Sequence, residues 1–145
     1  MSKYTEIKKD FVDRTRKNIE YAVKNDIPYE CTNLVNSCFG LIVFPKSFHS
    51  NETLRKLFPN DYSSYGLSIT DIKKIKNGDK SLASIIIHLR NGLSHGLIEQ
   101  EVINGDIHGI CVCDKDSTHG VHTEIHLSIN ELHKLALFVS EKVQP

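Results

Sequence analysis

Apolar residues recur at helical spacing through much of the first two thirds of the 145-residue chain. This pattern predicts a long helix over about residues 4–25, and a second helix that begins after Pro28 and ends at Phe44-Pro45. Residues 46–78 are less regular. There, Ser50 is placed to cap a short helix that runs through Phe58, and Thr70 to cap another through about Lys76.

A third helix is predicted to start at Gly78-Asp79, and its apolar stripe continues to Leu93. Gly96 suits the left-handed backbone just past the end of a helix. The period then changes from helical to alternating. Asn104-Gly105 is a strong signal for a tight turn, and residues 121–127 alternate cleanly between apolar and polar. Ser128-Ile129-Asn130-Glu131 has the form of a capping box and predicts a last helix.

These elements predict a mainly α fold, an up-and-down helical bundle with a small three-stranded antiparallel β-meander inserted before the last long helix, which makes it α+β overall. We expect one domain, with a helical part at 1–96, a β-insert at 97–127 and a closing helix at 128–143. The hydrophobic fraction of 39% and the charged fraction of 25% are ordinary for a soluble domain.

Composition narrows the class of protein further. Neither a membrane span nor a secretory signal is visible, and the four cysteines lack zinc-site or redox spacing, so we expect a cytoplasmic protein with reduced thiols. The formal net charge is zero, but residues 1–96 carry 15 Lys and Arg against 10 Asp and Glu. The first part could therefore attract a polyanion, although no stretch is basic enough to be a nucleic-acid-binding arm.

Residues 88–96, HLRNGLSHG, hold the most informative chemistry of the chain. Arg90 offers a permanent charge that can bind a phosphate with paired hydrogen bonds, and His95 can exchange a proton near neutral pH. The alternative is structural: Arg90 and Asn91 hydrogen-bond the unpaired carbonyls of this helix end, while His95 fills the boundary with the sheet. Spacing alone leaves both interpretations open.

The order Arg90-Asn91-Gly92-Leu93-Ser94-His95 resembles the R-N-x-x-x-H form of the R-x4–6-H motif of the HEPN superfamily. The residues 29–37 and 41–46 also resemble a group of small, single-domain bacterial and plasmid-encoded HEPN proteins. Members are helical bundles, often dimeric, and many are metal-independent endoribonucleases in toxin–antitoxin and antiphage systems. The resemblance covers most of residues 1–97 and the last helix.

The resemblance implies roles for particular residues. Arg90 would bind the scissile phosphate, His95 would exchange the proton of the attacking 2′-hydroxyl or the departing 5′-oxygen, and Asn91 would orient Arg90 or the phosphate. RNA would be cut to a 2′,3′-cyclic phosphate with no metal or other cofactor. Supporting positions are Ser94, Glu30 and Asn33, although a solvated helix face explains the last two as well.

The resemblance also implies partners. A homodimer would supply two histidines to one cleft, and an antitoxin protein would restrain the enzyme. Leu97 stands where some HEPN toxins carry a tyrosine that a partner nucleotidyltransferase modifies, which argues against that regulation here. The alternative function is a catalytically silent HEPN module that binds a nucleotide or a partner protein.

The C-terminal third is rich in potential metal ligands. His122 and His126 share a face of the predicted strand but lie about 13 Å apart at 3.3 Å per residue, too far for one ion. Nothing in the sequence fixes further ligands beside Cys111 and Cys113. We therefore predict no metal site among these residues, which are His108, Cys111, Cys113, His119, His122, His126 and His133.

Overall fold

The computed structural model describes residues 7–25, 30–43 and 49–143. Its helices are α1 (Ile7–Lys24), α2 (Glu30–Val43), α3 (Asn51–Leu57), α4 (Leu82–Ser94) and α5 (Ile129–Lys142), with 3₁₀ turns η2 (Tyr62–Tyr65) and η3 (Lys76–Gly78). Its strands are β1 (Asp71–Lys74), β2 (Ile98–Ile103), β3 (Asp106–Asp116) and β4 (Gly120–Ser128). The strands form one antiparallel sheet in the order β1-β4-β3-β2.

The expected fold class is wrong in two respects. The sheet has four strands instead of three, and it is a full layer of an α+β fold rather than a small insert in a mainly α bundle. The fourth strand is β1, where a helix from Thr70 was expected. Asp71 and Ile72 pair instead with His126 and Ile125 of β4, so this segment is the edge strand of the sheet.

Most other predicted elements are confirmed where the structure describes them, but the helix predicted to start at Gly78-Asp79 begins at Leu82 instead, because the Ser81 side chain caps it. Ser50 caps α3 by accepting a hydrogen bond from the Thr53 backbone. Asn104-Gly105 turns the chain between β2 and β3. Both hydrogen bonds of the predicted capping box are present at the start of α5, between Ser128 and Glu131.

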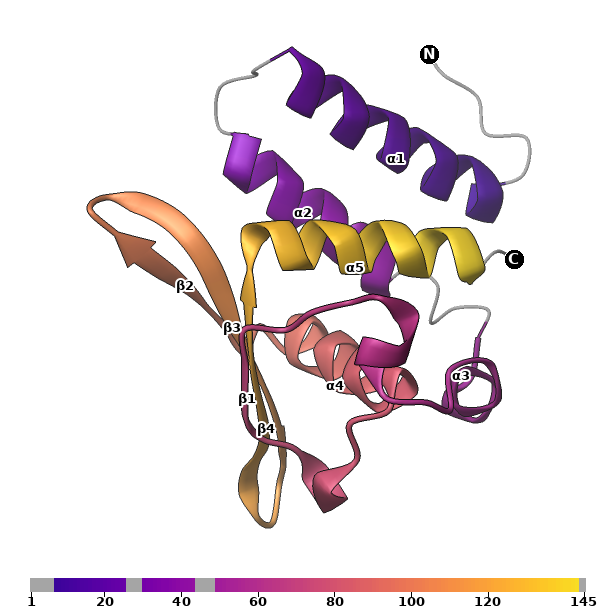
Figure 1. Cartoon of the computed structure of the whole chain (residues 1–145), viewed down its shortest axis with the longest axis vertical. Coiled ribbons are helices and arrows are strands. Elements are labelled where there is room, and N and C mark those ends of the chain that lie inside the picture. The colour runs from indigo at the N-terminus through magenta and orange to yellow at the C-terminus, as the bar shows by residue number, and fades with distance from the viewer. Residues whose placement is uncertain (1–6, 26–29, 44–48, 144–145) are drawn as a thin grey trace.

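The core lies where α4 and α5 cover one face of the sheet and where α2 packs on α5 (Figure 1). Alternate positions of β3 and β4 point into this core, as expected for a sheet with one face buried. Its fully buried large side chains include Leu41, Ile42, Ile85, Ile86, Leu89, Ile110, Ile125, Leu127 and Leu132. The hairpin of β2 and β3 extends beyond the helices (Figure 1).

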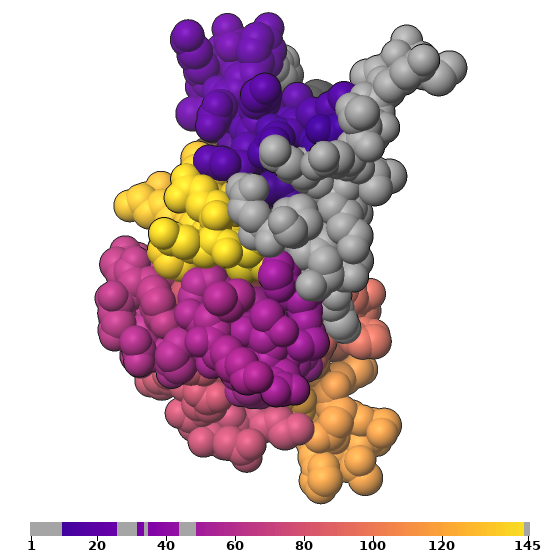
Figure 2. All heavy atoms as spheres, turned by 90° about the vertical axis from the view of Figure 1, so that its right-hand side faces the viewer, coloured from indigo at the N-terminus to yellow at the C-terminus, as the bar shows by residue number. Residues whose placement is uncertain are grey.

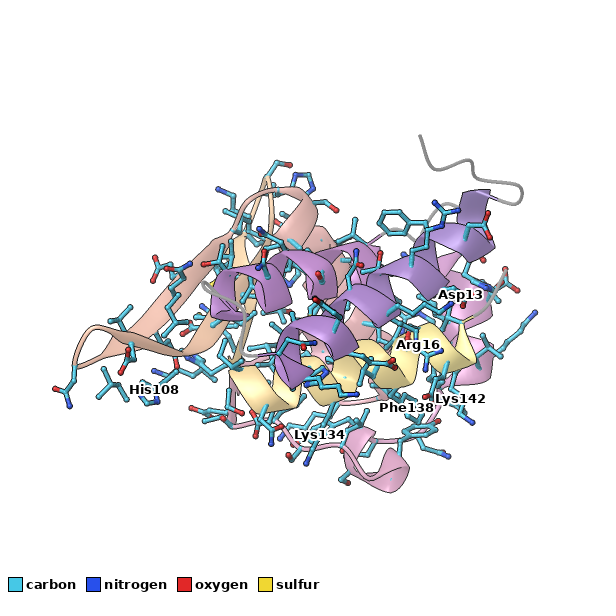
Figure 3. All side chains as sticks on the ribbon, turned by 90° about the horizontal axis from the view of Figure 1, so that it is seen from above. Asp13, Arg16, His108, Lys134, Phe138 and Lys142 are labelled. Atoms are coloured by element: carbon cyan, nitrogen blue, oxygen red, sulfur yellow. The ribbon has the colours of Figure 1, made fainter. Side chains whose placement is uncertain are left out.

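Two peripheral contacts complete the fold. The segment that holds α3 and the following turn, magenta in Figure 2, fills the surface between α5 and the strand residues drawn in orange. Arg16 of α1 reaches toward α5 (Figure 3), where its Nη2 lies 3.1 Å from Glu141 Oε1. Among the helices of the described part, none has the length and apolar character needed to cross a membrane.

Candidate functional site

The Arg90–His95 tract forms the last turn and cap of α4. Leu97 N–H donates to Gly92 O and Gly96 N–H to Leu93 O, and Gly96 has a φ of +69°. This is the glycine-terminated helix end that the sequence predicted, and it satisfies these carbonyls with backbone groups. Gly92 is needed for packing: a Cβ there would lie 2.4 Å from the carbonyl oxygen of Cys113 in β3.

Arg90 lies on the core side of α4 and is only 1% exposed. Its Nε donates a 2.8 Å hydrogen bond to the carbonyl of Ile42, in the last turn of α2. Nη1 and Nη2 are buried and have no hydrogen-bond partner among the described residues. Burial lowers the pKa of this guanidinium to about 10, so it is still charged at neutral pH.

His95 is placed very differently from Arg90. It is the C-cap of α4 and is exposed, and its backbone N–H donates to the Asn91 carbonyl. Ser94 beside it is also exposed. Within this one chain the imidazole therefore faces solvent while the guanidinium faces α2.

Asn91 belongs to a buried polar cluster between α4 and β3. Its Nδ2 donates to Asp114 Oδ2 at 3.0 Å, and His88 Nδ1 lies 2.7 Å from the same oxygen. His88 and Asp114 are both buried, so the carboxylate depends on these donors for its stability inside the protein. Asp114 thereby fixes the second residue of the motif and orients the His88 ring.

A β-bulge adds His122 to the cluster. Asp114 pairs with Thr123 and the next residue of β3, Lys115, pairs with Val121, which leaves His122 as the extra residue of β4. A bulge redirects a side chain, and here the His122 ring lies 5.3 Å from the His88 ring, with Nε2 3.9 Å from Asp114 Oδ2. The sequence could not reveal this, since strict alternation puts His122 on the other face.

The cluster opens into a pocket of about 600 Å³. Asn91, His88, Asp114 and His122 form one part of its wall. Cationic side chains come from two further elements, Arg55 of α3 and Lys76 of η3, and from Lys115 of β3. The carboxylates of Asp79 and Asp116 also line the pocket. The pocket thus places two imidazoles, three cationic side chains and three carboxylates, those of Asp79, Asp114 and Asp116, beside the motif helix.

A second cluster lies on the opposite face of the sheet, where Cys111 of β3 pairs with His126 of β4. Cys111 Sγ is 3.6 Å from His126 Nε2, which is 2.8 Å from Glu124 Oε1, and His126 Nδ1 contacts Glu101 of β2. Desolvation acts to lower the pKa of His126, but its hydrogen bonds to the two carboxylates raise it above the usual value. Burial and the neighbouring Cys113 raise the pKa of Cys111 to about 12.

The two remaining predicted site residues belong to α2. Asn33 is exposed on α2, and the side chain of Glu30 lies outside the described part of the structure. The alternative interpretation, in which Arg90 and Asn91 hydrogen-bond the unpaired carbonyls at the end of their own helix, also differs from the structure. Arg90 caps a carbonyl of α2 rather than of its own helix, and Asn91 binds a carboxylate.

The structure thus carries the Arg-Asn-x-x-x-His order at the C-terminal turn of α4, a helix that packs on α2 and on the sheet. The family model described as HEPN pEK499 p136 matches residues 1–144, and the chain belongs to this family. No curated protein and no solved structure matches the chain in the comparisons made.

Proposed function

We propose that the protein is an endoribonuclease that cleaves RNA by attack of a 2′-hydroxyl on the adjacent phosphate, to give a 2′,3′-cyclic phosphate. The reaction uses Arg90 and His95 and needs no metal ion. Membership of a HEPN family supports a role in RNA or nucleotide chemistry. The observation that carries the proposal is the unsatisfied guanidinium of Arg90.

A buried cation with two unpaired nitrogens destabilises a folded protein. Burying a charge without partners costs several kcal/mol or more, and each unsatisfied group of this kind calls for an explanation. Arg90 Nη1 and Nη2 are such atoms among the described residues. They are two parallel donors that match the oxygens of a phosphate, which would supply the missing charge and acceptors.

His95 supplies the proton transfer in this proposal. It is exposed at the end of α4, so an RNA strand can reach its imidazole. As a general acid, the imidazole would give a proton to the departing 5′-oxygen. Asn91 lies one turn earlier on the pocket wall, and its bond to Asp114 ties the motif to the adjacent imidazoles and cations.

Phosphate access requires a local rearrangement, because Arg90 is 1% exposed. The site is therefore formed on binding, when substrate or a second copy of the chain displaces the groups that cover the guanidinium. The toxin–antitoxin or antiphage setting belongs to the proposal as well. Growth arrest on expression of the protein would support this setting, if the arrest is relieved by loss of His95 and by co-expression of an antitoxin.

The first test is cleavage of labelled RNA by purified variants. We expect His95→Ala to lower the rate by about 100-fold or more, as loss of a general acid–base group does, with its fold intact. EDTA should leave wild-type cleavage unchanged, and the product ends should be cyclic phosphates. His108→Ala is the control, since His108 is exposed on the hairpin away from the helices (Figure 3). Cleavage that persists in the His95 variant would refute the role of that residue.

The burial of Arg90 favours a second candidate, a HEPN module that binds a nucleotide or a partner protein without cutting RNA. In that case Arg90 would only tie α4 to α2 through Ile42. Equilibrium binding of labelled nucleotides and RNA distinguishes the two. A protein that binds nucleotide with no cleavage under any condition, and no change on loss of His95, is the silent module.

A further inference from the structure

The cluster of Cys111, Glu124 and His126 lies outside the motif and its pocket. The register of β3 and β4 places Cys111 opposite His126 and Cys113 opposite Glu124, on the face of the sheet turned away from the core. Three different ligand types, a thiol, a carboxylate and an imidazole, therefore meet at one point, although Cys111 lies 13 and 15 residues before Glu124 and His126. Cross-strand pairing achieves what spacing along a single strand cannot.

We propose that Cys111 Sγ, Glu124 Oε1 and His126 Nε2 bind a divalent transition-metal ion of the zinc type. All three atoms lie within 4.8 Å of one another. Cys111 Sγ is 3.6 Å from His126 Nε2 and 4.0 Å from Glu124 Oε1, and the last two atoms are 2.8 Å apart. Tetrahedral zinc with its usual bond lengths requires separations of about 3.4–3.6 Å, which small side-chain adjustments would give.

The surroundings of His126 fit a metal ligand. Its other ring nitrogen, Nδ1, contacts the Glu101 carboxylate, which fixes the ring and holds a proton on Nδ1, so that Nε2 can coordinate an ion once it has given up the proton it shares with Glu124. Metal-binding histidines commonly have such a carboxylate partner. The cluster is partly accessible, with the His126 side chain 15% and the Glu124 side chain 27% exposed, so an ion can enter and water can take the fourth position.

Binding of a divalent ion leaves the net charge of this cluster unchanged, because two protons are released. The ion replaces the thiol proton of Cys111 and the proton that His126 Nε2 shares with Glu124, and both protons go to solvent. Thiolate and imidazole ligands together favour zinc, cobalt or copper over magnesium and calcium, which prefer oxygen ligands.

The cluster of His88, Asp114 and His122 also meets the distance criterion for an ion, but it is the weaker candidate. Asp114 Oδ2 already accepts hydrogen bonds from His88 and Asn91, and the structure offers it no thiolate neighbour in that pocket. The two clusters therefore make different predictions for substitution.

The experiment is titration of the chelator-treated full chain with Co²⁺ and Zn²⁺. Co²⁺ should bind one ion per chain with a thiolate-to-cobalt charge-transfer band, and Zn²⁺ should raise Tm by about 5–10 °C at ~100 times its Kd. Cys111→Ser should abolish the band, and Glu124→Gln and His126→Gln should weaken binding. Glu101→Gln should keep the band but weaken binding by about 10–100-fold, as for loss of a positioning residue.

Asp114→Asn and His119→Gln are the controls, one in the competing cluster and one in the exposed turn after β3. Circular dichroism without metal shows whether each variant is folded, and if Cys111→Ser is not, the glutamate and histidine variants carry the test. The proposal is overturned if no metal-dependent band or Tm shift occurs, if the band survives Cys111→Ser, or if Asp114→Asn removes binding. It is independent of the proposed nuclease, which EDTA should not inhibit.

Discussion

At Arg90, stability favours an apolar side chain, whereas the proposed function requires a positive charge. Its methylene groups pack in the core and its Nε binds Ile42 O, while its charge has no counter-ion among the described residues. A buried charge of this kind is often replaceable by an apolar side chain of similar length with no loss of stability. Its value must then lie in binding rather than in folding.

This argument predicts the behaviour of Arg90→Met. The free energy of unfolding should stay within about 1 kcal/mol of wild type or rise, since removal of the charge offsets the lost hydrogen bond. RNA cleavage should be lost. Urea denaturation and the cleavage assay measure the two effects on the same sample. A loss of stability above about 3 kcal/mol would instead make Arg90 a structural clamp between α4 and α2.

Residue patterns predicted local structure well and side-chain partners poorly. Gly96, Ser50 and the Ser128–Glu131 capping box were predicted because caps depend on neighbours within four residues. The orientation of His122 depends on a bulge, which is a property of how two strands pair. The burial of Arg90 likewise depends on where α2 lies, and no local pattern contains that information.

The contact between α4 and β3 is the element-scale feature that positions the motif. At Gly92 the helix comes so near the strand that a Cβ would lie 2.4 Å from Cys113 O and 2.5 Å from Val112 Cγ1. The first of these atoms belongs to the backbone and cannot rotate away. The motif helix is therefore seated on the sheet at a spacing that only glycine permits.

Gly92→Ala should consequently destabilise the protein although alanine favours a helix. Overpacking destabilises by about 1–3 kcal/mol and the higher helix propensity of alanine stabilises by about 1 kcal/mol, so a net loss of up to about 2 kcal/mol is expected in thermal or urea unfolding. Gly40→Ala in α2 is the matched control, because among the described residues its Cβ would meet only the flexible Phe11 side chain, at 3.2 Å. A stable Gly92 variant would show that α4 can shift from β3 without penalty.

The strand β1 shows why one element could not be predicted. Ile72 and Ile75 are three residues apart, as on a helix, and Asp71, Lys73 and Lys74 are exposed. An edge strand with one half-buried residue has no alternating pattern to detect. Its conformation is set by pairing with β4, a contact between residues fifty or more positions apart. The clusters at Cys111 and Asp114 were missed for the same reason.

The arrangement of the whole molecule bears on how the proposed site is completed. One chain exposes His95 at the end of α4 but buries Arg90 against α2. We propose that the active form is a symmetric dimer in which the α4 ends of two copies meet, so that each site uses residues of both copies.

Mixing two inactive variants tests this arrangement. If Arg90 of one copy acts with His95 of the other, a heterodimer of Arg90→Met and His95→Ala chains contains one intact site. Equal mixing with free subunit exchange should then restore about a quarter of wild-type cleavage, since half of the dimers are mixed and each has one working site of two. If both residues act within one chain, every site in the mixture lacks one of them and the rate stays at the background of the separate variants. Light scattering at the assay concentration shows whether dimers are present. If the mixture is dimeric and cleavage does not recover, the shared site is refuted. The same variants, assayed separately, then test the single-chain arrangement.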